Sequence, residues 1–423
     1  MYTIAVLTIG DEICIGQVVN TNAAWIAEQC TAIGAQVVAH SSVGDDPHRM
    51  LEELKRLSGK HHCVIITGGL GPTHDDITKD VLCTLVGDVM IEDPEVLEDL
   101  KQALQRRGRP FTERQRGQAM RPSVAVVLPN KVGSAPGLHL TYNDSAMISL
   151  PGVPREMKAI MTESVLPMIS KSIADGNHDV MMYETMIAAG CTESTLADMI
   201  GPPEEFLRGA SLAFLPSVNG IRLRIGVSAL TQAQGKQRIA EIESIIRERA
   251  GVFIVGAGTD SVSAIVHREL LSTSSTISVA ESCTGGLIGT ILTDTPGSSG
   301  YFMGGVECYS NASKVRDVGV DVGTLEKYGA VSRECVSELA VKIREKFQTT
   351  IGVAVSGIAG PDGGTDEKPV GTVWMAVADE KGVEARVHNF GTDRTTTRER
   401  AASTALTMVL RRLRNQEIED RYL

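Results

Sequence analysis

A serine and a lysine at two predicted strand ends are the residues best suited to catalysis in this sequence. The strand-like run Thr276–Ala280 leads into residues 281–286 (ESCTGG), which predicts a strand–turn–helix with Ser282 at the turn. Tyr309 and Lys314 follow the next predicted strand. Helix-start N–H groups stabilise an oxyanion, and a lysine acts as a base when its pKa is lowered. The pattern therefore allows nucleophilic catalysis with Ser282 as nucleophile and Lys314 as base, in which Tyr309 relays a proton or positions the leaving group.

Two other interpretations of this turn stay open. In the first, Ser282 caps a helix and Lys314 is solvated; in the second, Cys283 is the nucleophile. The motif GxSxG is absent, so an α/β-hydrolase is not expected. A Ser-His-Asp triad is not expected either, because neither histidine after residue 256, His267 or His388, falls on a predicted loop.

A second group of chemically capable residues follows strands near the N-terminus. The apolar run Cys63–Thr67 ends in TGGLGPTHDD, whose glycines precede a predicted helix and let backbone N–H groups approach a phosphate. Carboxylates follow in this loop and in other strand-end loops, at Asp11, Glu12, Asp45, Asp75 and Asp76. A phosphate cradle beside carboxylates is typical of a divalent metal bound to a phosphate or pyrophosphate. Alternatively, the glycines form a tight turn and the aspartates cap helices.

The elements that must position these residues fall into three α/β segments. Residues 1–173 alternate strands and helices, which predicts a doubly wound sheet with ligands beyond the carboxyl ends of its strands. Residues 174–256 have the β-α-β-β-α-β order of a ferredoxin-like domain, with a hairpin turn at Ser217–Gly220. Residues 257–423 predict a second α/β domain.

The periodicity also predicts the bounds of individual elements. The expected strands are Ile4–Ile9, Gln36–Val43, Cys63–Thr67, Val180–Ala188, Ser211–Leu215, Ile221–Ser228, Val252–Val255, Thr276–Ala280, Gly304–Tyr309, Ile351–Val355, Val370–Ala378 and Ala385–Phe390. The expected helices include Ala23–Ile33, Met50–Leu57, Glu193–Ile200, Ala233–Ala250, Val262–Leu271, Cys335–Phe347 and Thr396–Leu413, with another near Leu287.

Composition and charge narrow the classes of function. A net charge of −11 and an aromatic content of 4% argue against a broad nucleic-acid surface, which needs clustered cations and exposed rings. No apolar run is long enough for a membrane span, and residues 1–10 do not look like a signal peptide. The eight cysteines form no CxxC pair, so reduced thiols and a cytoplasmic location are expected.

Several N-terminal motifs resemble the CinA family (competence/damage-inducible protein A). GDEICIGQVVNTNAAWIAEQ, VGDD, TGGLGPTHDDITKDVL and LPGVPREM are similar to its first domain, which is related to the MoaB/MogA molybdopterin-binding fold. The resemblance implies an ADP-ribose pyrophosphatase that uses Mg²⁺, Mn²⁺ or Co²⁺ together with K⁺. It implies phosphate binding by Gly68, Gly69, Gly71 and Thr73. It also implies metal binding by Asp45 and Asp76, with Asp11, Glu12 and Asp75 as further ligands.

Motifs in the third segment resemble the C-terminal CinA domain, which also occurs alone as a nicotinamide mononucleotide (NMN) amidohydrolase. AESCTGGLIGTILTDTPGSSGYFMGGVECYSNASKVRDVGV and VSGIAGPDGGTDEKPVGTV carry the likeness. The family's catalytic Ser, Tyr and Lys fall on Ser282, Tyr309 and Lys314. The resemblance implies substrate binding by Thr284, Gly285, Gly286, Asn311, Ser356, Gly357, Gly360, Arg394 and Arg398, and no cofactor in this domain. Ser356 stands where the family usually has Thr, which keeps the hydroxyl.

Together these features predict a bifunctional, nucleotide-recycling hydrolase. The expected domains are a MoaB/MogA-like domain (1–173), a ferredoxin/KH-like domain (174–256) and an NMN amidohydrolase domain (257–423). The expected ligands are NMN and ADP-ribose, and a homodimer is expected, without membrane or direct nucleic-acid contacts. The alternatives are a molybdopterin-pathway enzyme and a non-enzymatic adaptor in competence or DNA damage.

Overall fold

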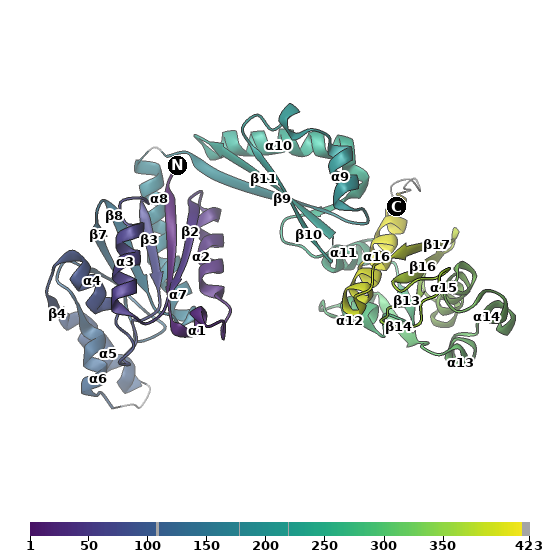
Figure 1. Ribbon diagram of the computed structural model, residues 1–423, viewed down its shortest axis with the longest axis horizontal. Coiled ribbons are helices and arrows are strands. Elements are labelled where there is room, and N and C mark those ends of the chain that lie inside the picture. Colours follow the sequence, from purple (N-terminus) through teal and green to yellow (C-terminus); the bar gives the residue numbers. More distant parts are fainter. Residues whose placement is uncertain (107–109, 177, 219, 417–423) are drawn as a thin grey trace. The chain divides into compact units, whose positions relative to one another are not determined.

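The computed structural model describes residues 1–106, 110–176, 178–218 and 220–416, which form two compact units (Figure 1). One unit contains Met1–Tyr183 and Val227–Arg238, and the other contains Glu184–Gly226 and Ile239–Leu423. Asn219 of the predicted hairpin turn and residues 417–423 of the predicted third domain lie outside the described residues. No helix in the described ranges has the length and apolar character needed to cross a membrane.

The N-terminal sheet has six strands in the order β2-β1-β3-β8-β7-β6. Four of them are parallel, namely β1 (Thr3–Ile9), β2 (Gln36–Val43), β3 (Cys63–Thr67) and β8 (Ser145–Leu150). The antiparallel strands β7 (Gly137–Tyr142) and β6 (Val126–Leu128) extend the sheet at one edge, and neither they nor β8 were predicted. β3 is buried along its whole length, as expected for a central parallel strand covered on both faces.

Helices cover both faces of this sheet, which confirms the doubly wound prediction (Figure 1). Ile4 and Val6 of β1 pack with one group of helices, and Ala5 and Leu7 pack with the other, because successive strand side chains point to opposite faces. The first group is α2 (Thr21–Ala32), α7 (Pro154–Ile160) and α8 (Leu166–Asp175), and the second is α3 (Pro47–Leu57) and α4 (Thr78–Val86).

An additional segment lies between α4 and β6 in the chain. It contains β4 (Met90–Glu92), α5 (Pro94–Arg106), α6 (Glu113–Arg116), the 3₁₀ turn η1 (Gly117–Ala119) and β5 (Met120–Pro122). β4 and β5 form a separate antiparallel pair. A short helix α1 (Asp11–Cys14) follows β1 directly.

The middle sheet has the predicted ferredoxin-like order of elements. Its strands lie in the order β10-β11-β9-β12. The elements are β9 (Val180–Ala188), α9 (Glu193–Ile200), β10 (Ser211–Ser217), β11 (Gly220–Ala229), α10 (Gln232–Ala250) and β12 (Ile254–Ala257). The predicted start of the last strand at Val252 is wrong, because Gly251–Phe253 form a 3₁₀ turn and place the buried Phe253 ahead of the strand.

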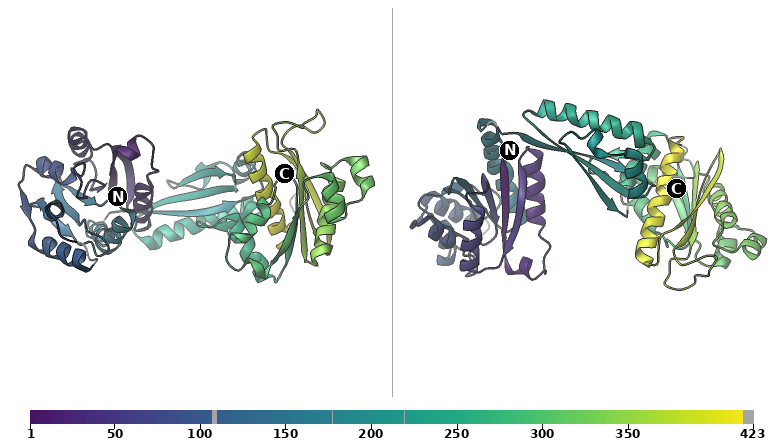
Figure 2. Two further views of the ribbon diagram at one scale, coloured as in Figure 1. Left: turned by 90° about the horizontal axis from the view of Figure 1, so that it is seen from below. Right: turned by 45° about the horizontal axis from the view of Figure 1, so that its top comes forward.

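The C-terminal sheet has five strands in the order β14-β13-β15-β16-β17. β13 (Ile277–Glu281) is parallel to β14 (Phe302–Glu307) and to β15 (Ile351–Gly357), whereas β16 (Thr372–Asp379) and β17 (Gly382–Asn389) continue antiparallel. Helix α15 (Arg333–Phe347) covers one face (Figure 2). The other face is covered by α11 (Val262–Ser272), α12 (Leu287–Thr293) and α16 (Arg394–Leu413).

This topology brings four loops to one edge of the C-terminal sheet. β13, β14 and β15 are parallel, so the residues that follow each strand emerge at the same edge. β17 has the direction of β15, so α16 begins at this edge as well. After β14 the chain forms helix α13 (Asn311–Ser313), a π-helical turn (Lys314–Val318) and helix α14 (Val322–Tyr328).

Candidate active site

Ser282 and Lys314 meet at this edge of the C-terminal sheet. Lys314 Nζ donates a hydrogen bond to Ser282 Oγ at 3.0 Å. Both side chains are buried, with 8% of Ser282 and 1% of Lys314 exposed. The alternative with a solvated Lys314 is therefore wrong. Ser282 does not cap α12 either, since the cap residue is Gly286.

Two main-chain carbonyls fix the position of the Lys314 amine. The oxygens of Cys308 and Tyr309 accept hydrogen bonds from Nζ at 2.7 and 3.4 Å. The lysine lies within reach because Ser310 caps α13 and the chain then continues into the π-helical turn. Such turns are frequent at functional sites. The amine thus has three acceptors, as many as an ammonium group has donors.

Main-chain hydrogen bonds attach the Ser282 turn to both neighbouring strands. The N–H of Ser282 donates to the carbonyl of Val355 at 3.1 Å, and the N–H of Cys308 donates to the carbonyl of Glu281 at 2.8 Å. The nucleophile candidate is therefore held by β15 on one side and by the end of β14 on the other.

The turn leaves N–H groups available beside Ser282. No other described residue accepts a hydrogen bond from the amides of Cys283 and Thr284, although the Cys283 amide interacts with its own thiol. Gly285 and Gly286 have φ angles of 57° and 83°, a left-handed conformation that favours glycine. These two glycines turn the chain back toward α12, and the amides of Cys283 and Thr284 are placed to stabilise an oxyanion.

The structure argues against Cys283 as the nucleophile. Its thiol is buried, with 5% exposed, and burial raises the pKa of this thiol to about 12. The reactive form of cysteine is the thiolate. At neutral pH the Cys283 thiol is therefore protonated and unreactive.

The hydroxyl of Tyr309 contacts Arg394 rather than the serine–lysine pair. Arg394 Nη2 donates to Tyr309 Oη at 3.3 Å, and Arg394 Nη1 donates to the Gly360 carbonyl at 2.8 Å. The Tyr309 side chain is exposed and, within the described ranges, makes no hydrogen bond to Ser282 or Lys314. The predicted proton relay is therefore not formed in this structure, because Arg394 holds the hydroxyl.

Arg398 contacts the main chain of the serine turn. Its Nε and Nη2 donate to the Thr284 carbonyl at 3.3 and 2.9 Å. The Thr284 hydroxyl is buried and has no hydrogen-bond partner in the described structure. Neither Arg394 nor Arg398 forms an ion pair with a described carboxylate. Their positive charges are therefore not neutralised within the described chain, which suits an anionic ligand.

The remaining predicted binding residues lie at the same edge without contacting the serine–lysine pair. Asn311 is exposed at the start of α13, and Ser356 and Gly357 end β15. A Cβ at Gly357 would lie 2.7 Å from the Thr372 carbonyl, so glycine is needed there for close packing of β15 and β16.

The N-terminal candidates line a cavity of about 350 Å³ at the carboxyl ends of β1, β3 and β8. The cavity is lined by the predicted residues Glu12, Asp45, Gly68, Gly69, Gly71, Asp75 and Asp76. A Cβ at Gly68 would lie 2.2 Å from the Ile9 carbonyl, so only glycine permits this close approach of β3 to β1.

Asp76 is a hydrogen-bond acceptor within the glycine loop. Its carboxylate accepts hydrogen bonds from the amides of Gly71 and Thr73 at 2.6 and 2.8 Å, and from the Thr73 hydroxyl. The amide of Gly68 donates to Leu150 instead. The amides of Gly68, Gly71 and Thr73 therefore already have acceptors in this structure, and phosphate binding by the loop stays a prediction.

The acidic residues do not form a ready metal site. Asp45 accepts from the Asp11 amide at 3.1 Å, and the Asp45 amide donates to the Asp11 carboxylate at 3.2 Å. Burial, with the charges of Asp11, Glu12 and Asp75, raises the pKa of Asp45. In the described ranges no three His, Cys, Asp or Glu side chains are arranged to hold a metal ion. The described side chains therefore offer no ready set of three ligands, and the divalent metal stays a prediction.

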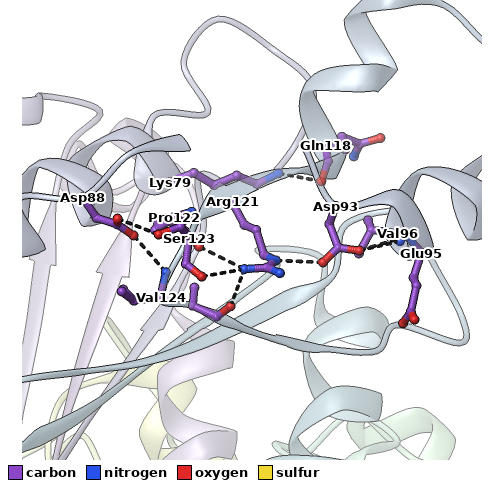
Figure 3. A network of polar contacts seen from close by, with 11 residues as sticks. Lys79, Asp88, Asp93, Glu95, Val96, Gln118, Arg121, Pro122, Ser123 and Val124 are labelled. Carbon is purple, nitrogen blue, oxygen red and sulfur yellow. Dashed lines mark hydrogen bonds and ion pairs between the residues drawn. The ribbon is translucent and has the colours of Figure 1, made fainter. Parts of the chain in front are cut away.

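The sequence analysis missed polar residues on the other wall of this cavity. Gln118, Ser134 and Glu156 line it, and Gln118 Nε2 donates to Ser134 Oγ at 3.4 Å. Buried Lys79 donates to the carbonyls of Gly117 and Gln118 at 3.2 and 2.8 Å. Figure 3 shows its contact with Gln118. Burial lowers the pKa of Lys79 to about 8. The motif LPGVPREM contains Glu156, but no spacing in the sequence indicates that Gln118 lies opposite the glycine loop.

Ion pairs hold together the segment that contains Gln118. Arg121 Nε donates to Asp93 Oδ2 at 2.8 Å, and Asp93 also caps α5 by accepting from the Glu95 and Val96 amides (Figure 3). Asp88 accepts from Ser123 Oγ at 2.7 Å. These contacts fix β4 and β5 next to α4 and so define one wall of the cavity.

Comparisons with known proteins agree with this architecture. Family profiles described as "Probable molybdopterin binding domain", "Damage-inducible protein CinA KH domain" and "CinA C-terminal domain" match residues 5–171, 184–256 and 259–413. The chain is similar to a CinA-like protein of Salinibacter ruber, with 41% identity over 95% of this chain and 97% of that protein. It is 39% identical to a CinA-like protein of Gemmatimonas aurantiaca over 99% and 98% of the two chains.

A solved structure of a competence/damage-inducible protein from Agrobacterium tumefaciens matches with 37% identity. It covers 36% of this chain and 93% of that chain, with a TM-score of 0.35. The two full-length relatives and the three matching profiles cover nearly all of the sequence, and they establish that the chain belongs to the CinA family.

Proposed function

We propose that the C-terminal site hydrolyses the carboxamide of NMN to nicotinate mononucleotide and ammonia. The observation that carries this proposal is the buried hydrogen bond of 3.0 Å between Lys314 Nζ and Ser282 Oγ. A serine paired with a lysine is a known variant of the catalytic arrangement used in acyl transfer. The resemblance to a stand-alone NMN amidohydrolase supports this choice of amide.

The carbonyls around Lys314 support its role as a base. A neutral amine has two N–H donors and one lone pair. The carbonyls of Cys308 and Tyr309 accept two N–H bonds, which directs the lone pair at Ser282 Oγ. In this protonation state Lys314 can remove the proton of Ser282 without moving.

The proposed reaction proceeds through an acyl-enzyme. Ser282 Oγ attacks the carboxamide carbon while its proton passes to Lys314 Nζ, and the amides of Cys283 and Thr284 stabilise the oxyanion. Lys314 then donates this proton to the departing ammonia. A water molecule, deprotonated by Lys314, attacks the ester and releases the carboxylate, with Ser282 protonated again.

Residues of α16 and its neighbours suit the rest of the substrate. The guanidinium groups of Arg394 and Arg398 lie in the first turns of α16 and are suited to the phosphate. The exposed ring of Tyr309 is held by Arg394 and can contact the nicotinamide.

Ammonia release from NMN tests the proposal. Ser282→Ala and Lys314→Met are each expected to lower kcat/KM at least about 1000-fold, because serine and base act as one unit. The matched controls are Ser272→Ala and Lys327→Met, which change exposed residues of the same unit and should retain wild-type activity. Full activity in Ser282→Ala would remove Ser282 from the mechanism.

We propose a second activity for the N-terminal cavity, namely cleavage of the pyrophosphate bond of ADP-ribose. It is supported by a cavity of about 350 Å³ that is lined by glycines and five carboxylate side chains, and by the resemblance to the pyrophosphatase domain. The proposed products are AMP and ribose 5-phosphate. The divalent metal and K⁺ remain proposals, and no step is assigned to them.

AMP formation from ADP-ribose, with and without a chelator, tests this second activity. Asp45→Asn is expected to lower the rate at least about 10-fold, since Asp45 lies in the cavity beside two other carboxylates. Glu52→Gln, an exposed change on α3, is the matched control. Molybdopterin binding without AMP formation would favour the alternative of a molybdopterin-pathway enzyme.

A further inference from the structure

Glu281 is a buried carboxylate that the proposed mechanism does not use. It is the last residue of β13, directly before Ser282, and is only 2% exposed. In the described structure its carboxylate contacts two backbone amides and no cationic side chain. Burial of an unpaired carboxylate is costly, so its two hydrogen bonds must be strong ones.

The two amides belong to the first turn of α12. Glu281 Oε2 accepts from Ile288 N–H at 3.0 Å, and Oε1 accepts from Gly289 N–H at 2.8 Å. A negative charge at a helix start also interacts favourably with the helix dipole. The carboxylate therefore ties the end of β13 to the start of α12 and closes a loop around residues 282–286.

The contact determines which amides remain for the reaction. The amides at the start of α12 already donate to Glu281, whereas no other described residue accepts from those of Cys283 and Thr284. The main chain of Glu281 is fixed too, since its carbonyl accepts from Cys308 N–H at 2.8 Å. Glu281 is thus anchored through its backbone and its side chain, at either end of the serine turn.

We propose that Glu281 is a positioning residue, which holds the Ser282 turn so that Ser282 Oγ faces Lys314 and the Cys283 and Thr284 amides face the developing oxyanion. This inference rests on the proposed amidohydrolase function. It differs from the expectation that the start of α12 itself binds the oxyanion, because Glu281 fills that helix end.

The substitution Glu281→Gln distinguishes an effect on the position of the Ser282 turn from an effect on folding. The amide side chain keeps the size of glutamate but places an NH₂ group against one of the α12 amides, where two donors face each other. Glu307→Gln is the matched control for loss of a charge beside the turn, because Glu307 is exposed, is the register partner of Glu281 and has its carboxylate next to Gly286 without the amide contacts of Glu281. Each full-length variant is compared with wild type in NMN turnover, with thermal unfolding measured in parallel.

We expect Glu281→Gln to lower kcat roughly 100-fold, because a small displacement of reacting groups has this effect. KM should stay within about twofold, because phosphate binding by α16 is unchanged, and Glu307→Gln should resemble wild type. Wild-type kcat in Glu281→Gln overturns the inference. So does a rise in KM alone, or a loss of activity that matches the fraction of unfolded protein.

Labelling of Ser282 by a fluorophosphonate probe distinguishes this inference from the choice of substrate. If wild type fails to release ammonia from NMN but is labelled at Ser282, the proposed substrate is wrong while the inference is still tested. Slower labelling of Glu281→Gln than of wild type and Glu307→Gln supports the inference. Equal labelling rates, or no labelling of Ser282 in wild type, overturn it.

Discussion

At the scale of single residues, the serine–lysine pair follows from the sequence and the contacts around it do not. The two strand ends predicted that Ser282 and Lys314 approach one another, and they are in contact at 3.0 Å. Arg394 holds the Tyr309 hydroxyl because α16 starts at the same sheet edge, and residues 85 positions apart in the chain give no local signal of this contact. The contact of Asp76 with its own loop could be anticipated from the sequence, since aspartate is a frequent hydrogen-bond acceptor in glycine turns.

The role of Cys283 can be tested directly. Cys283→Ala should retain NMN hydrolysis within about threefold, and iodoacetamide should not inactivate the wild type at neutral pH, because the raised pKa keeps the thiol protonated. Initial rates before and after alkylation measure this. Loss of activity that tracks alkylation of Cys283 would support the cysteine alternative.

The buried amine of Lys79 predicts a pH-dependent stability. Burial lowers its pKa from 10.5 to about 8, so between these pH values the unfolded chain binds more protons than the folded chain. The contribution of Lys79 to the free energy of unfolding should therefore increase by up to about 3 kcal/mol from pH 8 to pH 10.5. Cys30 and Cys63 act in the opposite sense, because burial raises their pKa values.

The Lys79 contribution is isolated as a difference between variants. Urea unfolding is followed through Trp25 in a Trp374→Phe background, so that fluorescence reports on the N-terminal unit. The stability of wild-type Lys79 relative to Lys79→Met should increase with pH, whereas exposed Lys60→Met should parallel wild type. Parallel curves for Lys79→Met and wild type would contradict the lowered pKa.

At the scale of elements, periodicity predicted many of the strands and helices. It failed where contacts between distant parts of the chain determine whether an element forms. β3, β9 and α9 have the predicted bounds, because buried or amphipathic runs between turn residues specify them locally. β6, β7 and β8 were missed; β6 is a three-residue strand at the edge of the sheet, too short for a periodic pattern. The β4–β5 pair depends on the Arg121–Asp93 contact across 28 residues, which no periodicity reveals.

The packing of α15 on the C-terminal sheet depends on a small residue in β15. A Cβ at Gly352 would lie 2.1 Å from the Ala340 carbonyl and 2.6 Å from Arg344 Cβ. Gly352→Ala should therefore push α15 away from the sheet and lower the free energy of unfolding by about 1–3 kcal/mol. Urea unfolding followed by Trp374, which packs near α15, measures the change.

The control for this prediction is Gly251→Ala in the same unit, where the nearest atom to a Cβ is Arg247 Cβ at 3.9 Å. It should change stability by no more than about 0.5 kcal/mol. An equal effect of the two substitutions would show that the contact between α15 and β15 is not the cause.

At the scale of the whole molecule, the chain carries two candidate sites on two different sheets. Each lies at the carboxyl ends of parallel strands, where α/β sheets place their ligands, and this general rule let the sequence locate both. The metal prediction rested on carboxylates in strand-end loops beside the glycine loop and on the resemblance. Among the described residues these carboxylates line a cavity but form no group of three metal ligands; Asp76 accepts from its own loop, and Asp45 accepts from the Asp11 amide.

The two proposed activities should be separable. Ser282→Ala is expected to leave AMP formation from ADP-ribose unchanged, and Asp45→Asn is expected to leave ammonia release from NMN unchanged, because the two residues lie in different compact units. Both assays are run on the same preparations of full-length protein. Loss of both activities in either variant would contradict independent sites.

The central claim, that Ser282 and Lys314 act as one catalytic unit, is tested most directly by a double-mutant cycle. Values of kcat/KM for ammonia release from NMN are measured for wild type, Ser282→Ala, Lys314→Met and the double variant. Each single substitution should cost at least about 1000-fold, and the double variant should be no slower than the slower single variant, since members of a unit are not additive. Multiplied losses in the double variant, or substantial activity in either single variant, would contradict the account.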